Sequence, residues 1–268
     1  MEARIFDWVV IAWLAIAVMT FVSLFFISAP YGRHARGGWG PMIKSRTGWI
    51  LMEAVSPLVM VGCFVAGNRH ADTMALVFLS MWVGHYANRA FIFPFRSRGG
   101  DKPMPLSVAV MAMFFNSVNG YLNGRWLFTL SPIYPTSWLG DPRFLAGLAL
   151  FLGGFAINFH SDEVLLALRK PGETGYKIPR GGLYRFISSP NYFGEIIEWC
   201  GFALATFSLP GLTFAAWTIA NLVPRAITNH RWYHDKFPDY QTERRAINPL
   251  PAALARLRGN GGAGSATP

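Results

Sequence analysis

Long stretches without charge restrict this fold more than any other feature of the sequence. Residues Trp8 to Ile27 are twenty consecutive positions with no ionisable side chain. An α-helix rises about 1.5 Å per residue, so this stretch is long enough to cross the hydrocarbon core of a bilayer once. Four more apolar stretches follow, at Trp49 to Gly67, Thr73 to Phe93, Leu106 to Leu122 and Phe144 to Phe159. The sequence therefore predicts an integral membrane protein built from helices.

The composition excludes other classes of protein. Charged residues make up 14% of the chain and hydrophobic residues 52%, which is far from the averages of soluble domains. The 15% aromatic content excludes a disordered chain. Cys63 and Cys200 both lie in apolar stretches, which indicates packing thiols and excludes a disulfide scaffold.

The final apolar stretch, from Trp199 to Pro224, is 26 residues long and contains Pro210 and Gly211 near its middle. Because a Pro-Gly pair is typical of a turn, we expect two helices joined there. The predicted fold class is therefore an all-α integral membrane protein with seven transmembrane helices. We expect the Gly- and Ala-rich residues 258–268 to be a disordered tail.

The Lys and Arg residues indicate the orientation of the spans. With seven spans they are concentrated on every second loop, as expected of the cytosolic side. The opposite side carries only Arg4, Arg69, Arg125 and Arg143. We therefore expect the N-terminus outside and the C-terminus in the cytosol. A net charge of +10 would suggest nucleic-acid binding in a soluble protein, but here topology explains it, so we expect no nucleic-acid partner.

Two short motifs are misleading. Gly259, Gly261 and Gly264 match the spacing of a dinucleotide-binding loop, yet no predicted strand precedes them. His230 and His234 have the spacing of a helical metal pair, but six histidines are too few for the histidine boxes of membrane di-iron enzymes. We interpret both histidines as interfacial or hydrogen-bonding residues and expect no metal.

Ionisable and amide side chains are costly inside a span, so each is a candidate functional residue. Such residues share helix faces near the cytosolic ends of three predicted spans: Asn158, Asp162 and Arg169; Asn191, Glu195 and Glu198; Arg225, Asn229 and Tyr233. Any one of these stripes could serve only to join helices through hydrogen bonds. Three stripes on one side, with a basic loop that carries Arg169, Lys170 and Lys177, predict a pocket for an anionic, water-soluble ligand.

A second set of polar residues lies deeper in the membrane. Trp49, Glu53 and Ser56 share a face of the second span, and Tyr86 and Arg89 share a face of the third. A buried carboxyl favours its neutral form, which can donate a hydrogen bond, so Glu53 and Tyr86 together could stabilise an oxyanion. A purely structural contact between the two is an equally good interpretation.

Several segments of the chain together carry a specific resemblance to one known family. They are Asn158 to Asp162, Leu168 to Glu173, Tyr176 to Leu183, Ser189 to Trp199, Ala203 to Pro210, Arg225 to Tyr233 and Asp239 to Pro249, with weaker matches at Trp49 to Glu53 and His85 to Arg89. In these segments the chain resembles the steroid 5α-reductase family, membrane enzymes that use NADPH to reduce the 4,5 double bond of 3-oxo-Δ4-steroids. The resemblance covers nearly the whole chain except the tail.

The resemblance implies a fold and a set of site residues. Members of the family have seven transmembrane helices and bind the nicotinamide cofactor on the cytosolic side. Glu53 and Tyr86 match the carbonyl-binding pair, and NADPH as hydride source makes metal and flavin unnecessary. The implied cofactor contacts are Asn158, Asp162, Arg169, Tyr176, Asn191, Glu195, Arg225, Tyr233 and Arg244, followed by Arg89 and Asn229.

The predicted domain spans residues 1–257, with 1–130 mainly on the substrate side and 140–250 mainly on the cofactor side. Trp49 and Phe115 are expected to line the site of a lipophilic, steroid-like substrate that enters from the bilayer. The expected location is a bacterial inner membrane or the endoplasmic reticulum, and the sequence indicates no obligate protein partner. Met52 stands where steroid reductases often have Gln, which leaves substrate selectivity open. Asn229 stands where a close relative has His.

Three other functions fit parts of the sequence. A reductase of another lipid, such as an enoyl-thioester, a polyprenol or a sterol ring, would have a related C-terminal half. A membrane methyltransferase that binds S-adenosylmethionine would share the Pro-Asn-Tyr segment but generally has fewer spans. A non-catalytic lipid transporter would need a polar path through the bilayer, whereas only Glu53, Tyr86, Asn116 and Asn119 lie deep in the predicted spans.

Overall fold

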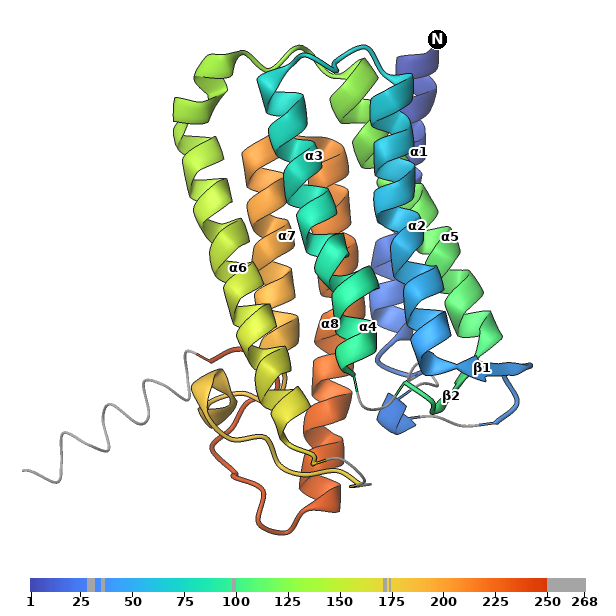
Figure 1. Cartoon of the computed structure of the whole chain (residues 1–268), viewed down its shortest axis with the longest axis vertical. Coiled ribbons are helices and arrows are strands. Elements are labelled where there is room, and N and C mark those ends of the chain that lie inside the picture. Colours follow the sequence, from blue (N-terminus) through green and yellow to red (C-terminus); the bar gives the residue numbers. More distant parts are fainter. Residues whose placement is uncertain (28–31, 35–36, 98–99, 171–172, 174, 250–268) are drawn as a thin grey trace, which may run out of the picture.

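The computed structural model describes residues 1–27, 32–34, 37–97, 100–170, 173 and 175–249. Seven long helices run side by side along its long axis (Figure 1). The bounds are α1 Glu2–Ser23, α2 Ser45–Ala66, α3 Thr73–Tyr86, α5 Leu106–Arg125, α6 Pro142–Ala167, α7 Pro190–Thr206 and α8 Leu209–Lys236. Each apolar stretch predicted to be helical is helical over most of its length, although α1 ends at Ser23 and not at Ile27. The predicted tail and the Gly259 motif lie outside the described residues.

Three of these helices are long and apolar enough to cross a membrane within the described part of the chain, and they are α1, α2 and α6. α3 has only 14 residues, but it continues through a π-helical segment, η2 (Ala87–Ile92), and the short α4 (Phe93–Arg96). α7 has 17 residues, fewer than the roughly 20 of a straight crossing. The length and apolar character of α1, α2 and α6 therefore identify the chain as a helical membrane protein.

The connection between α7 and α8 differs from the prediction. The break lies at Phe207, whose φ of 42° is left-handed, and at Ser208, whose hydroxyl accepts from the backbone N–H of Gly211 and caps α8. Pro210 lies in the first turn of α8, where its missing N–H leaves no helical hydrogen bond unmade. Two helices were correctly predicted, but the turn at Pro210 and Gly211 was wrong because this proline begins a helix.

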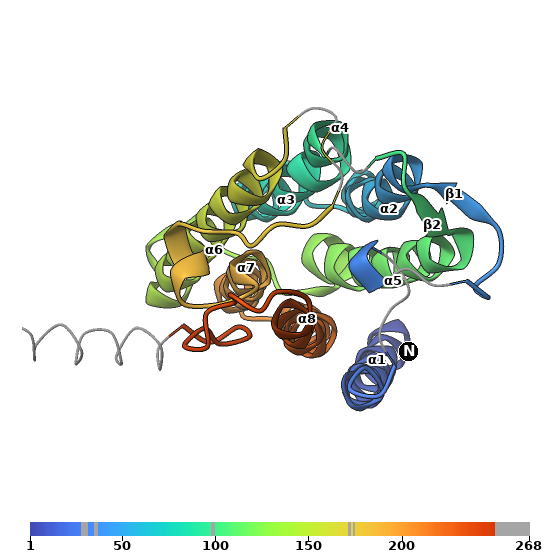
Figure 2. The ribbon, with the colours of Figure 1, turned by 90° about the horizontal axis from the view of Figure 1, so that it is seen from below.

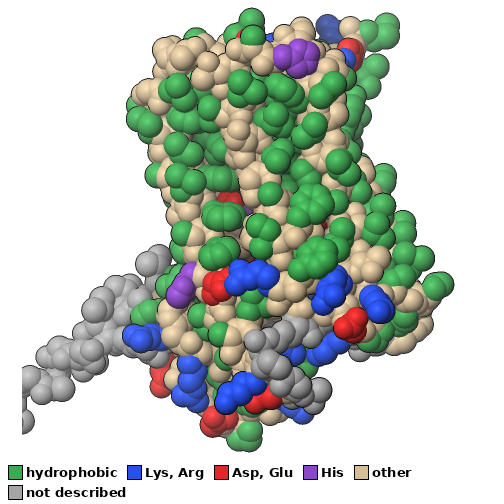
Figure 3. Space-filling view, in the orientation of Figure 1, with side chains coloured by type: hydrophobic (Ala, Val, Ile, Leu, Met, Phe, Trp, Pro, Cys, Tyr) green, Lys and Arg blue, Asp and Glu red, His purple; other side chains and the backbone are tan. Residues whose placement is uncertain are grey.

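A short antiparallel ribbon adds to the predicted all-α bundle. β1 (Met42–Lys44) pairs with β2 (Pro103–Pro105), with Ile43 opposite Met104. The ribbon joins the segment before α2 to the segment before α5. We call this end of the bundle the basic end, because Lys44, Lys102 and Arg96 lie there with the C-terminal ends of α6 and α8. Figure 3 shows most Lys and Arg side chains of that face gathered at this lower end.

Helices α6 and α7 approach each other backbone to backbone. A Cβ atom on Gly154 would lie 2.3 Å from the backbone nitrogen of Glu198, and one on Gly194 would lie 2.5 Å from that of Asn158. Gly147 and Gly201 make the same kind of contact two turns farther from the basic end. Small residues allow such close packing in membranes, where van der Waals contact replaces the hydrophobic effect. This contact fixes α6 and α7 relative to each other at the site described below.

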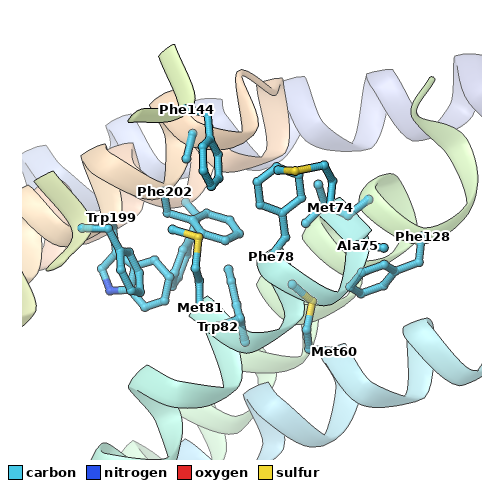
Figure 4. Packing of buried hydrophobic residues seen from close by; sticks show 14 of the residues in the cluster. Met60, Met74, Ala75, Phe78, Met81, Trp82, Phe128, Phe144, Trp199 and Phe202 are labelled. Atoms are coloured by element: carbon cyan, nitrogen blue, oxygen red, sulfur yellow. The ribbon is translucent and has the colours of Figure 1, made fainter. Parts of the chain in front are cut away.

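The core lies between α3 and α7. Trp82 of α3 is fully buried, with its ring centroid 5.0 Å from that of Trp199 and 5.3 Å from that of Phe202. Figure 4 shows these rings together with Phe78 and Met60, which extend the cluster to α2. In the view from below, α1 lies at the edge of the bundle, beside α8 (Figure 2).

Candidate functional site

A cavity of about 530 Å³ lies among α1, α2, α3, α5, α7 and α8. Aromatic rings close it toward the middle of the bundle, where Trp13 and Trp217 lie 4.7 Å apart and Phe115 lies 5.2 Å from Trp217. Toward the basic end it is lined instead by Glu195, Arg225 and other polar residues. The cavity therefore has an apolar inner part and a charged mouth, and its volume is in the usual range for small-molecule sites.

Glu53 and Tyr86 both line this cavity, from α2 and the end of α3. The Tyr86 hydroxyl donates to Oδ1 of Asn116 at 3.4 Å, and Nδ2 of Asn116 donates to the Met52 carbonyl at 2.6 Å. Pro57 lies one turn after Glu53 and has no N–H, so the Glu53 carbonyl cannot make its usual helical hydrogen bond. The structure thus brings the two expected hydrogen-bond donors to one apolar cavity.

Arg89 lies in the π-helical segment that follows Tyr86, a type of irregularity that is frequent at functional sites. Its guanidinium is 3.2 Å from Oδ2 of Asp162 and 3.8 Å from Oε2 of Glu195. It also lies over the ring of Trp49, 5.5 Å from the ring centroid, a distance at which a cation and an aromatic face attract each other. Arg89 therefore connects the part of the cavity near Tyr86 to the carboxylates on α6 and α7.

Amide side chains complete this network across the α6–α7 contact. Nδ2 of Asn158 donates to the backbone carbonyl of Asn191 at 3.0 Å, and Nδ2 of Asn191 donates to Asp162 at 3.2 Å. The Asn158 Oδ1 atom is buried and has no hydrogen-bond partner within the described residues. The network thus contains an unused acceptor and two carboxylates, Asp162 and Glu195, for the single guanidinium of Arg89. These groups are suited to a polar ligand with hydrogen-bond donors.

The mouth of the cavity is formed by α7, α8 and η1 (Gly32–His34). Arg225 donates to the Tyr192 hydroxyl at 2.8 Å. Asn229 pairs with Nε2 of His34 at 3.1 Å, which ties the segment before α2 to α8. Basic and amide groups, together with the Glu195 carboxylate, thus surround the opening at the basic end.

Other predicted cofactor residues form a layer beyond the cavity. The Tyr176 ring contacts Trp232 at 4.9 Å between centroids, and Arg169 lies over the same tyrosine at 5.9 Å. Tyr233 stacks on Tyr240, with centroids 5.0 Å apart. Of the predicted cofactor residues, Arg89, Glu195 and Arg225 line the described cavity. The others are not among its lining residues: Asn158, Asp162, Arg169, Tyr176, Asn191, Asn229, Tyr233 and Arg244.

Arg244 is the most deeply buried residue of this layer, with 2% of its surface exposed. Its Nε donates to Gln241 at 2.8 Å, its guanidinium lies over Tyr240, and its Nη1 is buried without a partner among the described residues. Nδ1 of His230 lies 2.6 Å from the Ser188 hydroxyl, which is also 2.7 Å from the Tyr240 hydroxyl. A buried guanidinium in such surroundings suits an anionic group.

Two members of the predicted stripes are placed differently. Arg169 does not share the helix face of Asn158 and Asp162, because α6 ends at Ala167. Glu198 does not face the charged mouth, since its Oε1 lies 2.8 Å from Nδ1 of His85 inside the bundle. Both corrections arise because helical spacing locates a residue on a face without showing where the helix ends or which neighbour the face meets.

The cavity also contains residues that the sequence did not single out as site residues. Tyr192 is one helical turn from Glu195, so the spacing of α7 could have identified it. Asn116 was noticed only as a deep polar residue. His34 reaches the cavity from a segment without helical or strand periodicity, and therefore had no signal of this kind in the sequence.

The fold and the site together describe a helical membrane protein whose apolar cavity opens at a charged mouth. The model of the 3-oxo-5-alpha-steroid 4-dehydrogenase family matches residues 102–251. The chain is 46% identical over 243 residues to 3-oxo-5-alpha-steroid 4-dehydrogenase 1 of Bos taurus, covering 88% of this chain and 93% of that protein. It is 41% identical over 253 residues to steroid 5-alpha-reductase DET2 of Gossypium hirsutum, covering 93% and 98%. The chain belongs to this family of oxidoreductases, which confirms the resemblance found in the sequence.

Proposed function

We propose that this protein uses NADPH to reduce the 4,5 double bond of a 3-oxo-Δ4-steroid to the 5α-dihydro product. The observation that carries this proposal is that Glu53 and Tyr86 line the same cavity, which is apolar in its inner part and charged at its mouth. Family membership supports the same reaction. The apolar walls, which include Trp49 and Phe115, fit the lipophilic ring system of such a substrate.

The roles of the chain's own residues follow from the charge that develops on the substrate. NADPH, when bound, supplies the hydride. As the β-carbon of the enone takes up the hydride, negative charge moves to the carbonyl oxygen, and addition of a proton to the α-carbon then completes the reduction. In this proposal Glu53, in its neutral form, and the Tyr86 hydroxyl donate hydrogen bonds to that oxygen, and the aromatic walls exclude water that would compete for it. Donors already in position in a dry site contribute more to the rate than the same groups in water.

The residues at the charged end fit the proposed cofactor. Buried Arg244 has an unpartnered Nη1 and forms no ion pair within the described part of the chain, so an anionic group would complete its surroundings. The buried Asn158 Oδ1 offers an acceptor that an amide could use. We therefore assign cofactor binding to the residues around the mouth and the layer beyond it: Arg89, Asn158, Asp162, Arg169, Tyr176, Asn191, Glu195, Arg225, Asn229, Tyr233 and Arg244.

Combining Asn191→Ala with Arg225→Ala is expected to weaken NADPH binding strongly. Asn191 joins Asp162 to Asn158, and Arg225 supplies positive charge at the mouth. A lost hydrogen bond to a charged group costs about 1.5 to 3 kcal/mol. Titration of the detergent-purified protein with NADPH measures the change. Arg231→Ala, which removes an exposed charge from the same helix, is the control. Wild-type affinity in the double variant would mean that these residues serve only packing.

Seven spans with the N-terminus outside and the C-terminus in the cytosol are part of the proposal. The concentration of Lys and Arg side chains at one end supports this orientation (Figure 3). Reporter fusions after Gly67 and after Gly259 are expected on opposite faces of the membrane. Fusions that report the same face would contradict the seven-span arrangement and would move the charged mouth to the other compartment.

The reaction itself is tested with purified protein, NADPH, and testosterone or progesterone. We expect loss of absorbance at the nicotinamide band together with a 5α-dihydro product identified by mass spectrometry. Oxidation of NADPH with an enoyl-thioester or a polyprenol, but not with either steroid, would favour another lipid reductase. No oxidation, with binding of S-adenosylmethionine, would favour the methyltransferase.

A further inference from the structure

Asn116 connects the two helices that carry Glu53 and Tyr86. It lies on α5 with 4% of its surface exposed, and it borders the cavity. Its amide nitrogen donates to the backbone carbonyl of Met52, the residue before Glu53, at 2.6 Å. Its amide oxygen accepts from the Tyr86 hydroxyl at 3.4 Å. One side chain therefore contacts the backbone beside one proposed donor and the hydroxyl of the other.

The two contacts together define which way the amide faces. The Met52 carbonyl can only accept, so it must meet the Asn116 NH₂ group, and the amide oxygen then faces Tyr86. A reversed amide would place two oxygens against each other at 2.6 Å. The orientation of Asn116 is therefore determined by its surroundings and is the same whether or not Tyr86 donates elsewhere.

The backbone of α5 is held close to α2 at the same level. A Cβ on Gly120 would lie 3.1 Å from the Ser56 carbonyl, and one on Gly124 would lie 2.7 Å from Cβ of Cys63. These glycines are four residues apart, a spacing that lets membrane helices pack closely. Asn116 lies one turn before Gly120, so its distance from the α2 backbone is set by this packing.

The α2 backbone needs such a support near Glu53. Pro57 removes the N–H that would bind the Glu53 carbonyl, and this weakens the helix one turn along from Glu53. The hydrogen bond from Asn116 to the Met52 carbonyl holds the adjacent peptide group from outside the helix. At 3.4 Å the bond from Tyr86 to Asn116 is long, so a substrate carbonyl can replace the amide oxygen as acceptor at little cost.

We propose that Asn116 is a positioning residue that sets the distance between Glu53 and Tyr86 and holds the Tyr86 hydroxyl at the border of the cavity until a substrate carbonyl replaces the amide oxygen. This inference rests on the proposed roles of Glu53 and Tyr86. Reaction rates depend steeply on such placement, because a displacement of about 1 Å can change a rate about 100-fold.

The test is a double-mutant cycle of Asn116→Ala with Tyr86→Phe, with turnover normalised to folded protein. Asn116→Ala alone is expected to lower kcat about 10- to 100-fold without changing the NADPH affinity. In the Tyr86→Phe background it should lower kcat much less, because part of its effect acts through the missing hydroxyl. Asn123→Ala is the matched control, since Asn123 is a buried amide on α5 that does not border the cavity.

The outcomes separate this inference from the function on which it rests. Tyr86→Phe with wild-type turnover would remove the proposed donor pair itself. Slow Tyr86→Phe combined with wild-type turnover in Asn116→Ala, or with equal losses from Asn116→Ala in both backgrounds, would overturn only the positioning role. Asn116→Leu, which keeps the volume and loses both hydrogen bonds, replaces the alanine variant if that one fails to fold. It is expected to give the same loss of kcat and the same coupling.

Discussion

Replacing Tyr86 by phenylalanine, or Glu53 by glutamine, is expected to slow turnover about 100-fold or more while NADPH binding stays near normal. Both side chains meet the substrate carbonyl in the proposed reaction, and the charge that they stabilise exists only as the reaction proceeds. Their loss therefore acts on the transition state and lowers kcat and kcat/KM together. Glutamine keeps one donor at position 53, so Glu53→Ala should be slower than Glu53→Gln.

Turnover per folded molecule decides between this role and a structural one. If Glu53 only supports the bundle, its loss should lower thermal stability and yield while each folded molecule keeps its activity. Glu163→Gln is the control for removing a carboxyl, because Glu163 lies on the outside of α6, paired with Arg96. Near wild-type turnover in Glu53→Ala would reject the proposed role of the carboxyl.

Gly154→Ala and Gly194→Ala are expected to lower stability and to weaken cofactor binding together. The new Cβ would lie 2.3 Å or 2.5 Å from a backbone nitrogen of the facing helix, and a backbone cannot rotate away as a side chain can. Overpacking of this kind typically costs about 1 to 3 kcal/mol. The helices must separate to relieve it, and this would pull Asn158 away from Asn191.

The neighbouring glycine provides the matched control for these substitutions. Gly153 precedes Gly154 on α6, and a Cβ there would meet nothing within 4 Å. Since alanine is about 1 kcal/mol better than glycine inside a helix, Gly153→Ala should be neutral or slightly stabilising. Thermal melting in detergent and NADPH titration measure both effects. Equal melting temperatures for Gly153→Ala and Gly154→Ala would show that the helices can separate without cost.

The helices could be predicted from the sequence because each depends on a local property, namely a long run of mostly apolar residues. The predictions were wrong where the structural role of a residue depends on its three-dimensional surroundings. Pro210 is typical of a turn but here begins α8 after the cap at Ser208. The ribbon between β1 and β2 joins segments about 60 residues apart, and neither is long or periodic enough to be recognised alone.

The candidate site was predictable to the extent that it follows helical spacing. Asp162, Asn191 and Glu195 were found as members of stripes, and the structure joins them across one helix contact. The close approach that brings them together depends on Gly154 and Gly194, which in the sequence are two glycines among 27. The partners of Asn116 and Glu198 depend on the rotation of whole helices relative to each other, and a single sequence does not contain that rotation.

The rings of Trp13, Trp217 and Phe115 end the cavity inside the bundle. A membrane protein with buried carboxylates risks becoming a proton leak, because each charge that crosses at 100 mV releases about 2.3 kcal/mol. Because the aromatic rings close one end of the cavity, the proposed cofactor and its phosphates enter and leave on the same side of the membrane. Their exchange then moves no charge across the bilayer. We therefore expect turnover to be independent of the membrane potential, even though the reacting atoms lie among transmembrane helices.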